Sequence, residues 1–582
     1  MNSNPLQSAK ESARLIIGEA IARAVGSGSL PAAELPEFSI EVPNDPANGD
    51  ISSNAALVSA KALRMSPRAI AEKIIENVDL NGSVFGTVSA AGPGFINFSY
   101  SGEYYKKVMT DVLSDGESYG YTDFGQGKKI MVEFVSANPT GPMHIGNARG
   151  AALGDCLSSV LNAAGYKVTR EFYLNDTGNQ VAKFGRSLGA RYMQIFDPEF
   201  PFPEDGYHGE DITEHAKAYA AENGDKLVNV PEDERDSALA QYALPINIEA
   251  LERDLLRYRV KYDVWFKESD LHASGLVKKV VDILTERGAT YEKDGAVWYR
   301  SSHFAEKYGG NKNARKGLEG EVNSEEKDEV LIRANGVPTY FAADIAYHYN
   351  KFFIRGFDRV INIWGADHHG HVARMKGSMD AIGLDGEKLD VVLMQLVRLV
   401  RDGEQVRVSK RSGNAITLVD LLDEIPIDAA RFFFNLREPS SHFDFDMGLA
   451  IQQNSDNPVY YVQYAHARIC SILKALSAEG YDVDDFSAAV YDRLEAPEEK
   501  ALIRHIGTLP SVIQSAAADY DPSKVTRYVL DTAALFHKFY AACRVKESED
   551  EIRVARTALC VATRQVLRNC LDILKVDTPE SM

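Results

Sequence analysis

A Pro- and Gly-rich turn places a histidine where phosphate chemistry is possible. The run Lys129–Val135 is of buried-strand type, and His144, Gly146 and Asn147 then open an Ala-rich helix. A helix N-terminus offers free N–H groups and a positive dipole end, which attract phosphate. His144 can donate a hydrogen bond to a phosphate oxygen, and Gly146 allows a nucleotide to approach the backbone closely. The alternative interpretation is a plain turn with a capping histidine. The turn consists of Ala137, Asn138, Pro139, Thr140, Gly141, Pro142, Met143, His144, Ile145, Gly146 and Asn147.

A second candidate for phosphate chemistry is the basic segment Arg407–Asn414, which follows the strand-like run Leu393–Val400. It contains Ser409 and Lys410, and a loop of this kind can close over a triphosphate. Its positive charge would stabilise a pentavalent transition state and a leaving pyrophosphate. A solvated basic loop is the alternative.

Three histidines, His368, His369 and His371, lie close together after the strand-like run Arg359–Gly365. Histidines at this spacing after a strand could bind zinc, and the residues alone leave that interpretation open. Earlier in the chain, Val330–Ala343 is also expected to form a strand.

Length and charge limit the class of protein. At roughly 100–200 residues per domain, 582 residues predict three to five domains. The net charge of -20 opposes generic binding to anionic surfaces, although local basic patches can still hold phosphates. The N-terminus lacks the apolar core of a signal peptide, no run reaches the roughly 20 apolar residues of a membrane span, and no CxxC pair occurs. We therefore expect a cytoplasmic protein with no membrane contact and no structural zinc.

The elements around the motifs predict an α/β protein in three parts. Lys129–Val135, the helix after His144 and the strand-like Lys167–Tyr173 form a strand–turn–helix–strand unit, which is typical of a parallel sheet. The first 120 or so residues mix helical and strand-like runs, as a small α+β domain does. From Ala429 to the end the pattern is helical with few breakers, which predicts an all-α bundle.

Together, the two phosphate-binding candidates resemble the HIGH and KMSKS signatures of class I aminoacyl-tRNA synthetases. The first has Asn147 in place of the final histidine, and the second keeps Ser409 and Lys410 but begins with arginine. The resemblance implies a Rossmann-like parallel-sheet catalytic domain, with His144 and Lys410 as catalytic residues. It also implies that ATP is bound by His144, Gly146, Asn147, Ser409 and Lys410.

Over nearly its whole length the chain is similar to the arginyl-tRNA synthetase family. The segments that carry the similarity include Pro43–Asp50, Glu133–Gly141, Thr339–Tyr347, Asp428–Arg431 and Asn457–Arg468. The family organisation implies an additional N-terminal domain at 1–120 that contacts the tRNA elbow. It further implies a catalytic domain at 121–428, with an insertion around 185–330, and a helical anticodon-binding domain at 429–582.

The same resemblance implies an arginine site. A guanidinium is planar, always charged and offers five donors, so its pocket needs acceptors and at least one carboxylate. Tyr340 and Asp344 are one helical turn apart and can face the same way if that segment is helical. The resemblance also places Asp367–His371 in the pocket wall, without a metal. The implied arginine-binding residues are Glu133, Ser136, Asn138, Tyr340, Asp344 and His368.

In the expected C-terminal bundle, Asn457 is predicted to cap a helix that has Pro458 in its first turn. Tyr460, Tyr464 and Arg468 then recur at four-residue steps and share a face. Such a face could stack unpaired bases and hold phosphates, although an aromatic stripe is also typical of a helix core. The candidate tRNA contacts are Tyr460, Tyr464, Arg468 and Met582.

The reaction implied by the resemblance has two steps. The arginine carboxylate attacks the α-phosphate of ATP, and a hydroxyl of the terminal adenosine of tRNA(Arg) then takes the arginyl group from the adenylate. L-Arginine, ATP and tRNA(Arg) are the implied partners, Mg²⁺ is expected to come with the ATP phosphates, and we expect a monomer. Two alternatives stay open: another class I synthetase, and a non-catalytic tRNA-binding relative.

Overall fold

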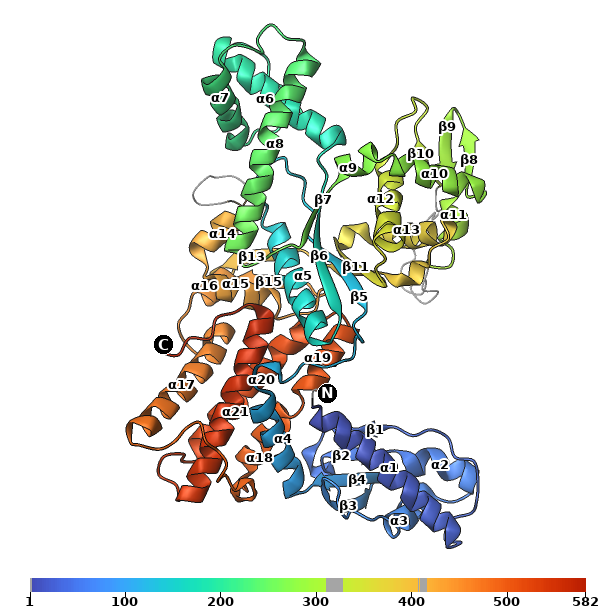
Figure 1. The fold of residues 1–582 in the computed structure, drawn as a ribbon, viewed down its shortest axis with the longest axis vertical. Helices are drawn as coiled ribbons and strands as arrows, with labels where there is room; N and C mark the ends of the chain where they lie inside the picture. Colours follow the sequence, from blue (N-terminus) through green and yellow to red (C-terminus); the bar gives the residue numbers. More distant parts are fainter. Residues whose placement is uncertain (1–2, 310–327, 407, 409–415) are drawn as a thin grey trace. The chain divides into compact units, whose positions relative to one another are not determined.

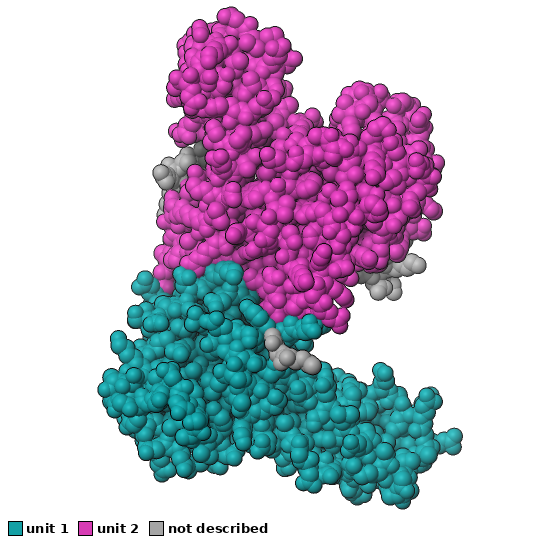
Figure 2. Space-filling model, in the orientation of Figure 1, with its two compact units in different colours: residues 1–124, 453–519, 524–582 teal, residues 125–452, 520–523 magenta. Residues whose placement is uncertain are grey.

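The structure is a computed structural model that describes residues 3–309, 328–406, 408 and 416–582. The chain forms two compact units, which Figure 2 shows in different colours. Unit 1 consists of residues 1–124, 453–519 and 524–582, and unit 2 of residues 125–452 and 520–523. None of the described helices is long and apolar enough to cross a membrane.

A five-stranded parallel sheet forms the centre of unit 2, which confirms the expected fold class (Figure 1). The strand order is β12-β11-β5-β6-β7, and each neighbouring pair is parallel. Strand β5 lies in the middle, where its apolar residues Ile130, Met131 and Val132 are buried, as in a strand covered on both faces. The strands are β5 (Lys129–Glu133), β6 (Lys167–Leu174), β7 (Val264–Lys267), β11 (Arg359–Gly365) and β12 (Leu389–Met394).

Helix α5 (Gly146–Ala163) connects β5 to β6, so the predicted strand–turn–helix–strand unit is confirmed. The helix is rich in small residues because it packs closely against its surroundings. At Gly154, an added Cβ would lie 2.1 Å from Cγ of Phe134, so only glycine lets that ring lie against the helix. The chain at the end of β5, before the His144 turn, is thereby packed against α5, which follows the turn.

Two insertions lengthen the connections of this sheet. Helices between β6 and β7 bury an apolar core of their own. They are α6 (Gly178–Phe196), α7 (Glu210–Asn223) and α8 (Glu232–Arg257). Between β7 and β11 lie α9 (Glu268–Ala273), α10 (Leu276–Glu286), α11 (Ser301–Phe304), α12 (Tyr340–Tyr349) and the antiparallel strands β8 (Thr290–Lys293), β9 (Ala296–Tyr299) and β10 (Glu329–Ile332).

The predicted strand at Val330–Ala343 is correct for Val330–Ile332 and wrong for the residues that follow. Strand β10 ends at Ile332, and α12 begins at Tyr340. The side chain of Thr339 caps this helix by accepting a hydrogen bond from the Ala342 N–H. Tyr340 and Asp344 therefore lie on a helix, one turn apart.

The predicted strand at Leu393–Val400 is divided between two sheets. Its start belongs to β12, and its end belongs to β13 (Val397–Arg401), which pairs with β14 (Glu404–Gln405) and β15 (Phe443–Asp446). The other helices of unit 2 are α13 (His369–Ala381), α14 (Leu418–Glu424), α15 (Ile427–Phe434) and α16 (Met447–Ala450).

Unit 1 combines an α+β part with an all-α part, as expected. The first part has an antiparallel sheet of order β1-β2-β4-β3. Its elements are α1 (Pro5–Gly26), β1 (Ile40–Glu41), β2 (Ile51–Ser53), α2 (Ala55–Leu63), α3 (Pro67–Ile75), β3 (Phe85–Ala91), β4 (Phe95–Tyr100) and α4 (Gly102–Asp115). The second part consists of α17 (Pro458–Ala478), α18 (Pro497–Ile506), α19 (Leu509–Ala518), α20 (Ser523–Ala542) and α21 (Asp550–Leu574).

Candidate functional site

A cavity of about 520 Å³ lies at the carboxyl ends of β5, β6 and β11 in unit 2. Ligands of open parallel sheets bind outside this edge. The cavity brings together four of the predicted ligand-binding residues, which are Glu133, Ser136, Asp344 and His368. The other lining side chains include Tyr173, Tyr347, His348, Asn362, Trp364, His371 and Arg374.

The backbone turns sharply where β5 enters this cavity. Val135 and Ser136 have φ angles of 69° and 46°, in the left-handed region that is costly for a β-branched residue. The turn brings the Ser136 hydroxyl back to Glu133, where Oγ donates to Oε1 at 3.0 Å. The same Oγ accepts a hydrogen bond from the N–H of Tyr173 at 3.1 Å. The strained turn therefore helps to orient the Glu133 carboxylate.

Two of the carboxylates that line the cavity, those of Glu133 and Asp344, have different surroundings. Glu133 is paired with the fully buried Lys351, whose Nζ lies 2.5 Å from Oε2. The Asp344 carboxylate lies 3.5 Å from Nε2 of His371, and 38% of its side chain is exposed. Asp344 is thus the more accessible of the two for a cationic ligand.

His348 is a neutral, buried part of the cavity wall. Burial, followed by the positive charge of Lys351, lowers its pKa well below the usual value. A neutral ring has one donor and one acceptor: here Nδ1 donates to the Asp344 carbonyl at 2.8 Å, and Nε2 accepts from Nδ2 of Asn362 at 2.9 Å. This tautomer satisfies both ring nitrogens.

The His144 turn contributes to a second cavity, of about 370 Å³, in the same unit. Its lining includes Asn138, His144 and Asn147. Gly146 is the first residue of α5, and its N–H donates to Nδ1 of His144 at 3.0 Å. The N–H of Ile145 donates to the carbonyl of Ile416 at 3.0 Å. The turn is therefore hydrogen-bonded to the chain directly after the second signature segment.

Tyr340 is not among the residues that line either cavity; it is 41% exposed, and its hydroxyl accepts a hydrogen bond from the N–H of Asn179 at 3.2 Å. Ser409 and Lys410 lie outside the described residues, as does Arg407. The ligand-binding roles of Tyr340, Ser409 and Lys410 stay predictions.

Sequence reasoning missed several residues that line the first cavity or contact the residues that line it. Asn362 could have been found, because it is a polar residue inside the apolar strand Arg359–Gly365. Lys351 carried no such signal, because a lysine between helical residues is ordinarily exposed. Among the described residues, no group of three or more His, Cys, Asp and Glu side chains is placed to hold a metal ion.

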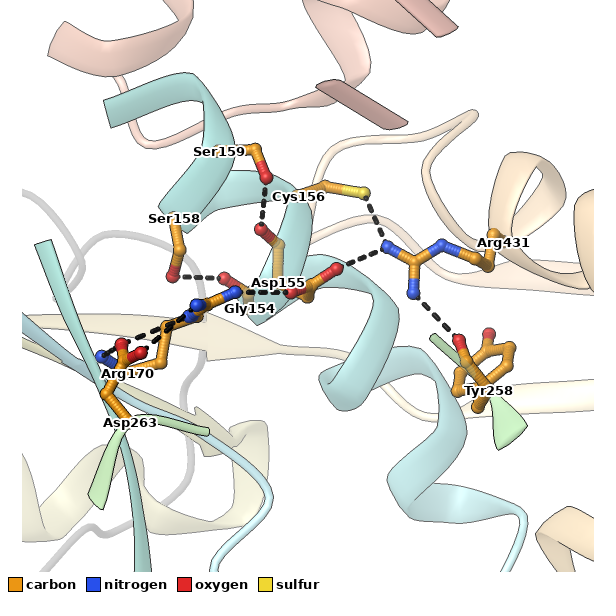
Figure 3. A network of polar contacts seen from close by, with 9 residues as sticks. All are labelled: Gly154, Asp155, Cys156, Ser158, Ser159, Arg170, Tyr258, Asp263 and Arg431. Carbon is orange, nitrogen blue, oxygen red and sulfur yellow. Dashed lines mark hydrogen bonds and ion pairs between the residues drawn. The ribbon is translucent and has the colours of Figure 1, made fainter. Parts of the chain in front are cut away.

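A buried polar network holds α5, the helix that follows the His144 turn in the sequence (Figure 3). Asp155 of α5 pairs with Arg431 of α15 at 2.6 Å, and both side chains are almost fully buried. Arg431 also donates to the carbonyl of Tyr258 at 3.0 Å. On the other side, Arg170 of β6 lies 3.4 Å from Asp155 and 3.1 Å from Asp263. These charges connect α5 with the sheet and with α15.

A separate cavity of about 810 Å³ occurs among the C-terminal helices of unit 1. Asn457 caps α17 and Pro458 begins it, as predicted. Tyr464 stacks on Tyr460, with ring centroids 6.3 Å apart, and the Arg468 guanidinium lies 5.2 Å from the Tyr464 ring. Three of the four candidate tRNA contacts, Tyr464, Arg468 and Met582, line this cavity.

Comparison with known proteins identifies relatives along the whole chain. The model of the class I (R) tRNA synthetase catalytic domain matches residues 108–442, the arginyl-tRNA synthetase N-terminal domain matches 12–100, and the DALR anticodon-binding domain matches 462–582. An arginine–tRNA ligase of Acetivibrio thermocellus is 50% identical over 582 residues, which is 100% of both chains. One of Ruminiclostridium cellulolyticum is 49% identical over 98% of this chain and 99% of its own. The solved arginyl-tRNA synthetase of Thermus thermophilus has the same fold, with a TM-score of 0.71, 22% identity and coverage of 97% and 99% of the two chains.

Proposed function

Because the chain belongs to the arginyl-tRNA synthetase family, we propose that the cavity at the carboxyl ends of β5, β6 and β11 binds L-arginine. The activity of the chain is the ATP-dependent ligation of arginine to tRNA, by a class I catalytic domain. One observation supports the arginine site: Glu133, Ser136 and Asp344 line the same cavity, although Asp344 is distant from the other two in the sequence.

In this proposal, Asp344 faces the guanidinium of arginine. A guanidinium is best held by a carboxylate and several further acceptors, and the Asp344 carboxylate is accessible from the cavity. Glu133 and Ser136 supply oxygen atoms at the end of β5. The arginine carboxylate then has to point toward the His144 turn, where ATP is expected.

ATP is proposed to lie on the His144 turn, with its phosphates near the N-terminus of α5. The positive end of the helix dipole favours phosphate there. Lys410 is proposed to stabilise the charge that develops as pyrophosphate leaves. Mg²⁺ would come with the ATP phosphates.

Catalysis under this scheme rests on positioning and charge stabilisation. The arginine carboxylate attacks the α-phosphate of ATP, which releases pyrophosphate and forms arginyl-adenylate. A ribose hydroxyl of the terminal adenosine of tRNA(Arg) then attacks the activated carbonyl, and AMP leaves. Neither step needs a covalent bond to the protein.

The cavity between α17 and α20 is proposed to receive unpaired bases of the anticodon region. Tyr464 presents an aromatic face and Arg468 a cation, which together suit a stacked base and its phosphate. Met582 would contribute an apolar contact at the same cavity.

Exchange of labelled pyrophosphate into ATP tests this function directly. We expect exchange with arginine among the protein-forming amino acids, and a strong dependence on tRNA(Arg). Exchange with a different amino acid would contradict the arginine site. A complete lack of exchange despite tight tRNA binding would indicate a relative that has lost catalysis.

A further inference from the structure

A chain of buried hydrogen bonds lies beneath the proposed arginine cavity and connects its two carboxylate-bearing elements. Lys351 is at its centre, in a π-helical turn (Asn350–Ile354) that directly follows α12. Its Nζ donates to Oε2 of Glu133 at 2.5 Å and to Oδ1 of Asn362 at 3.2 Å. Asn362 donates to His348, and His348 donates to the backbone carbonyl of Asp344.

The direction of every hydrogen bond in this chain is determined by Lys351. A lysine ammonium has three donors and no acceptor, so it makes the amide oxygen of Asn362 accept. The amide nitrogen must then donate to Nε2 of His348, which leaves Nδ1 as the donor to Asp344. With Lys351 as the donor, the whole chain requires a neutral histidine, and burial favours the neutral form of His348.

The cost of this arrangement suggests a purpose other than stability. Lys351 is fully buried, and its ammonium lies 3.9 Å from the centre of the Tyr347 ring. A buried ion pair contributes little net stability compared with apolar residues of the same volume, because both ions lose their hydration. It does, however, restrict where its partners can lie. The pair is located where β5, β11 and α12 meet at the cavity.

We infer that Lys351 is a positioning residue for arginine recognition, which holds Glu133 directly and the Asp344 end of α12 through Asn362 and His348. The inference rests on the proposed arginine site. It assigns the orientation of the Glu133 carboxylate and the placement of the Asp344 backbone to one buried cation that does not line the cavity itself.

A purely electrostatic role for Lys351 predicts the opposite result from a positioning role. Removal of a positive charge makes the cavity more negative, which by charge alone would lower the KM for the cationic substrate. Loss of positioning raises that KM instead. The sign of the change in Lys351→Met therefore separates the two roles.

The experiment compares Lys351→Met, Glu133→Gln and the double variant with the wild-type enzyme. We expect Lys351→Met to raise the KM for arginine by about tenfold or more, while the KM for ATP changes by less than about twofold. Because Lys351 also acts through Asn362 and His348, the double variant should have a higher arginine KM than Glu133→Gln, but the two single effects should combine to less than their product. Arginine affinity measured by calorimetry should follow the same order.

Lys376→Met is the matched control, because Lys376 also pairs with a carboxylate, that of Glu387, and lies over a tyrosine ring, but does not contact the cavity. It should leave both KM values unchanged. If Lys351→Met does not fold, the double variant still decides the question, since it carries neither buried charge. A double variant whose arginine KM is equal to or lower than that of Glu133→Gln would overturn the inference, as would two single effects that combine to their full product.

Two further results distinguish this inference from the arginine site on which it rests. If Asp344→Asn raises the arginine KM and Lys351→Met leaves it unchanged or lowers it, the site is correct and the inference is wrong. If neither variant changes the arginine KM, both are wrong. A lower melting temperature of Lys351→Met with normal arginine KM would mean that the lysine is only structural.

Discussion

Individual side chains around the arginine cavity differ in how much freedom they have. The oxygens of Glu133 are held by Ser136 and Lys351, whereas the carboxylate of Asp344 is partly exposed beside His371. A ligand can compete for the second carboxylate at lower cost than for the first, because fewer protein hydrogen bonds must be broken. Asp344 is therefore the residue whose charge should matter most for arginine binding.

The first prediction concerns Asp344→Asn, which keeps the size of the side chain and removes its charge. The KM for arginine should rise by about tenfold or more, because hydrogen bonds to charged groups contribute about 1.5–3 kcal/mol. Steady-state aminoacylation measures this, and the ATP KM should change little. Asp367→Asn is the control, since Asp367 lines the same cavity with 79% of its side chain exposed. An unaltered arginine KM in Asp344→Asn would assign the carboxylate role elsewhere.

The second prediction concerns His144, which is exposed at the start of α5. His144→Ala should lower the rate of adenylate formation by about 100-fold or more, as the loss of a donor to a developing negative charge does. Single-turnover measurement with saturating ATP tests the rate. His144→Asn retains a donor and should be less affected. Equal rates for His144→Ala and wild type would exclude a role in the reaction.

At the scale of elements, α5 is held from two sides. Asp155 reaches Arg431 on α15 and Arg170 on β6, so the helix that carries the His144 turn is joined to both neighbours by buried charge. Removal of Arg431 leaves the buried Asp155 carboxylate with Arg170 alone, at 3.4 Å, and the loss of a close buried partner costs more than the pair contributes.

Arg431→Leu should therefore destabilise unit 2 by about 3–5 kcal/mol. The fluorescence of the three tryptophans, Trp265, Trp298 and Trp364, follows unfolding of this unit, since all three lie in it. Arg398→Leu removes a comparable pair with Asp444 in which both side chains are exposed, and it should cost less than about 1 kcal/mol. The Asp155→Asn, Arg431→Leu double variant should recover part of the loss. Similar losses for both single variants would show that burial is not decisive.

A pH-dependent contribution is expected at α8. Burial raises the pKa of Asp236 from the usual 3.8 to about 6, despite the nearby charge of Arg235. A raised folded-state pKa means that the stabilising effect of the proton is present below the unfolded pKa and is lost as the pH rises through about 6. At pH 8 the charged carboxylate therefore destabilises the helices around it.

Asp236→Asn should raise the unfolding temperature at pH 8 by roughly 2–4 °C and give no gain near pH 4. Tryptophan fluorescence during heating measures both values. Asp233→Asn, an exposed position in the first turn of the same helix, should have little effect at either pH. A gain that is the same at both pH values would contradict the pKa argument.

At the scale of the whole molecule, we expect one unit to bind the small substrates and the other to bind the anticodon region of tRNA. The proposed arginine and ATP cavities lie in unit 2, and the cavity proposed for the anticodon region lies in unit 1. Variants in one unit should therefore change different kinetic constants from variants in the other.

Tyr464→Ala should raise the KM for tRNA(Arg) by about fivefold or more, because stacking of a base on an aromatic ring contributes about 1–3 kcal/mol. The arginine KM should stay the same. Tyr481→Ala is a close control, since Tyr481 is 37% exposed, Tyr464 is 36% exposed, and both lie under an arginine. Equal effects of the two substitutions on the tRNA KM would contradict the assignment of this cavity.

The sequence alone was sufficient for the main elements of the fold and for the family. Apolar runs separated by turn residues predicted β5, α5 and β6 in the correct order. The capping residue Asn457 and the first-turn residue Pro458 predicted the start of α17. These features depend on a few consecutive residues, so a local pattern contains the necessary information. The similarity to the family could also be found from local sequence patterns, because the family signatures are short segments at turns and helix starts.

Only the tertiary structure decided which side chains face one another. Lys351 pairs with Glu133 over a separation of 218 residues, and no local pattern indicates which buried lysine meets which carboxylate. The same holds for Tyr340, whose partner is Asn179 rather than a residue of the cavity, and for Arg431, which reaches Asp155 on α5. Such contacts depend on the order of the strands in the sheet and on the packing of helices against it. Periodicity determines which face of an element is buried, but the identity of the neighbour across the core is determined by the assembled fold.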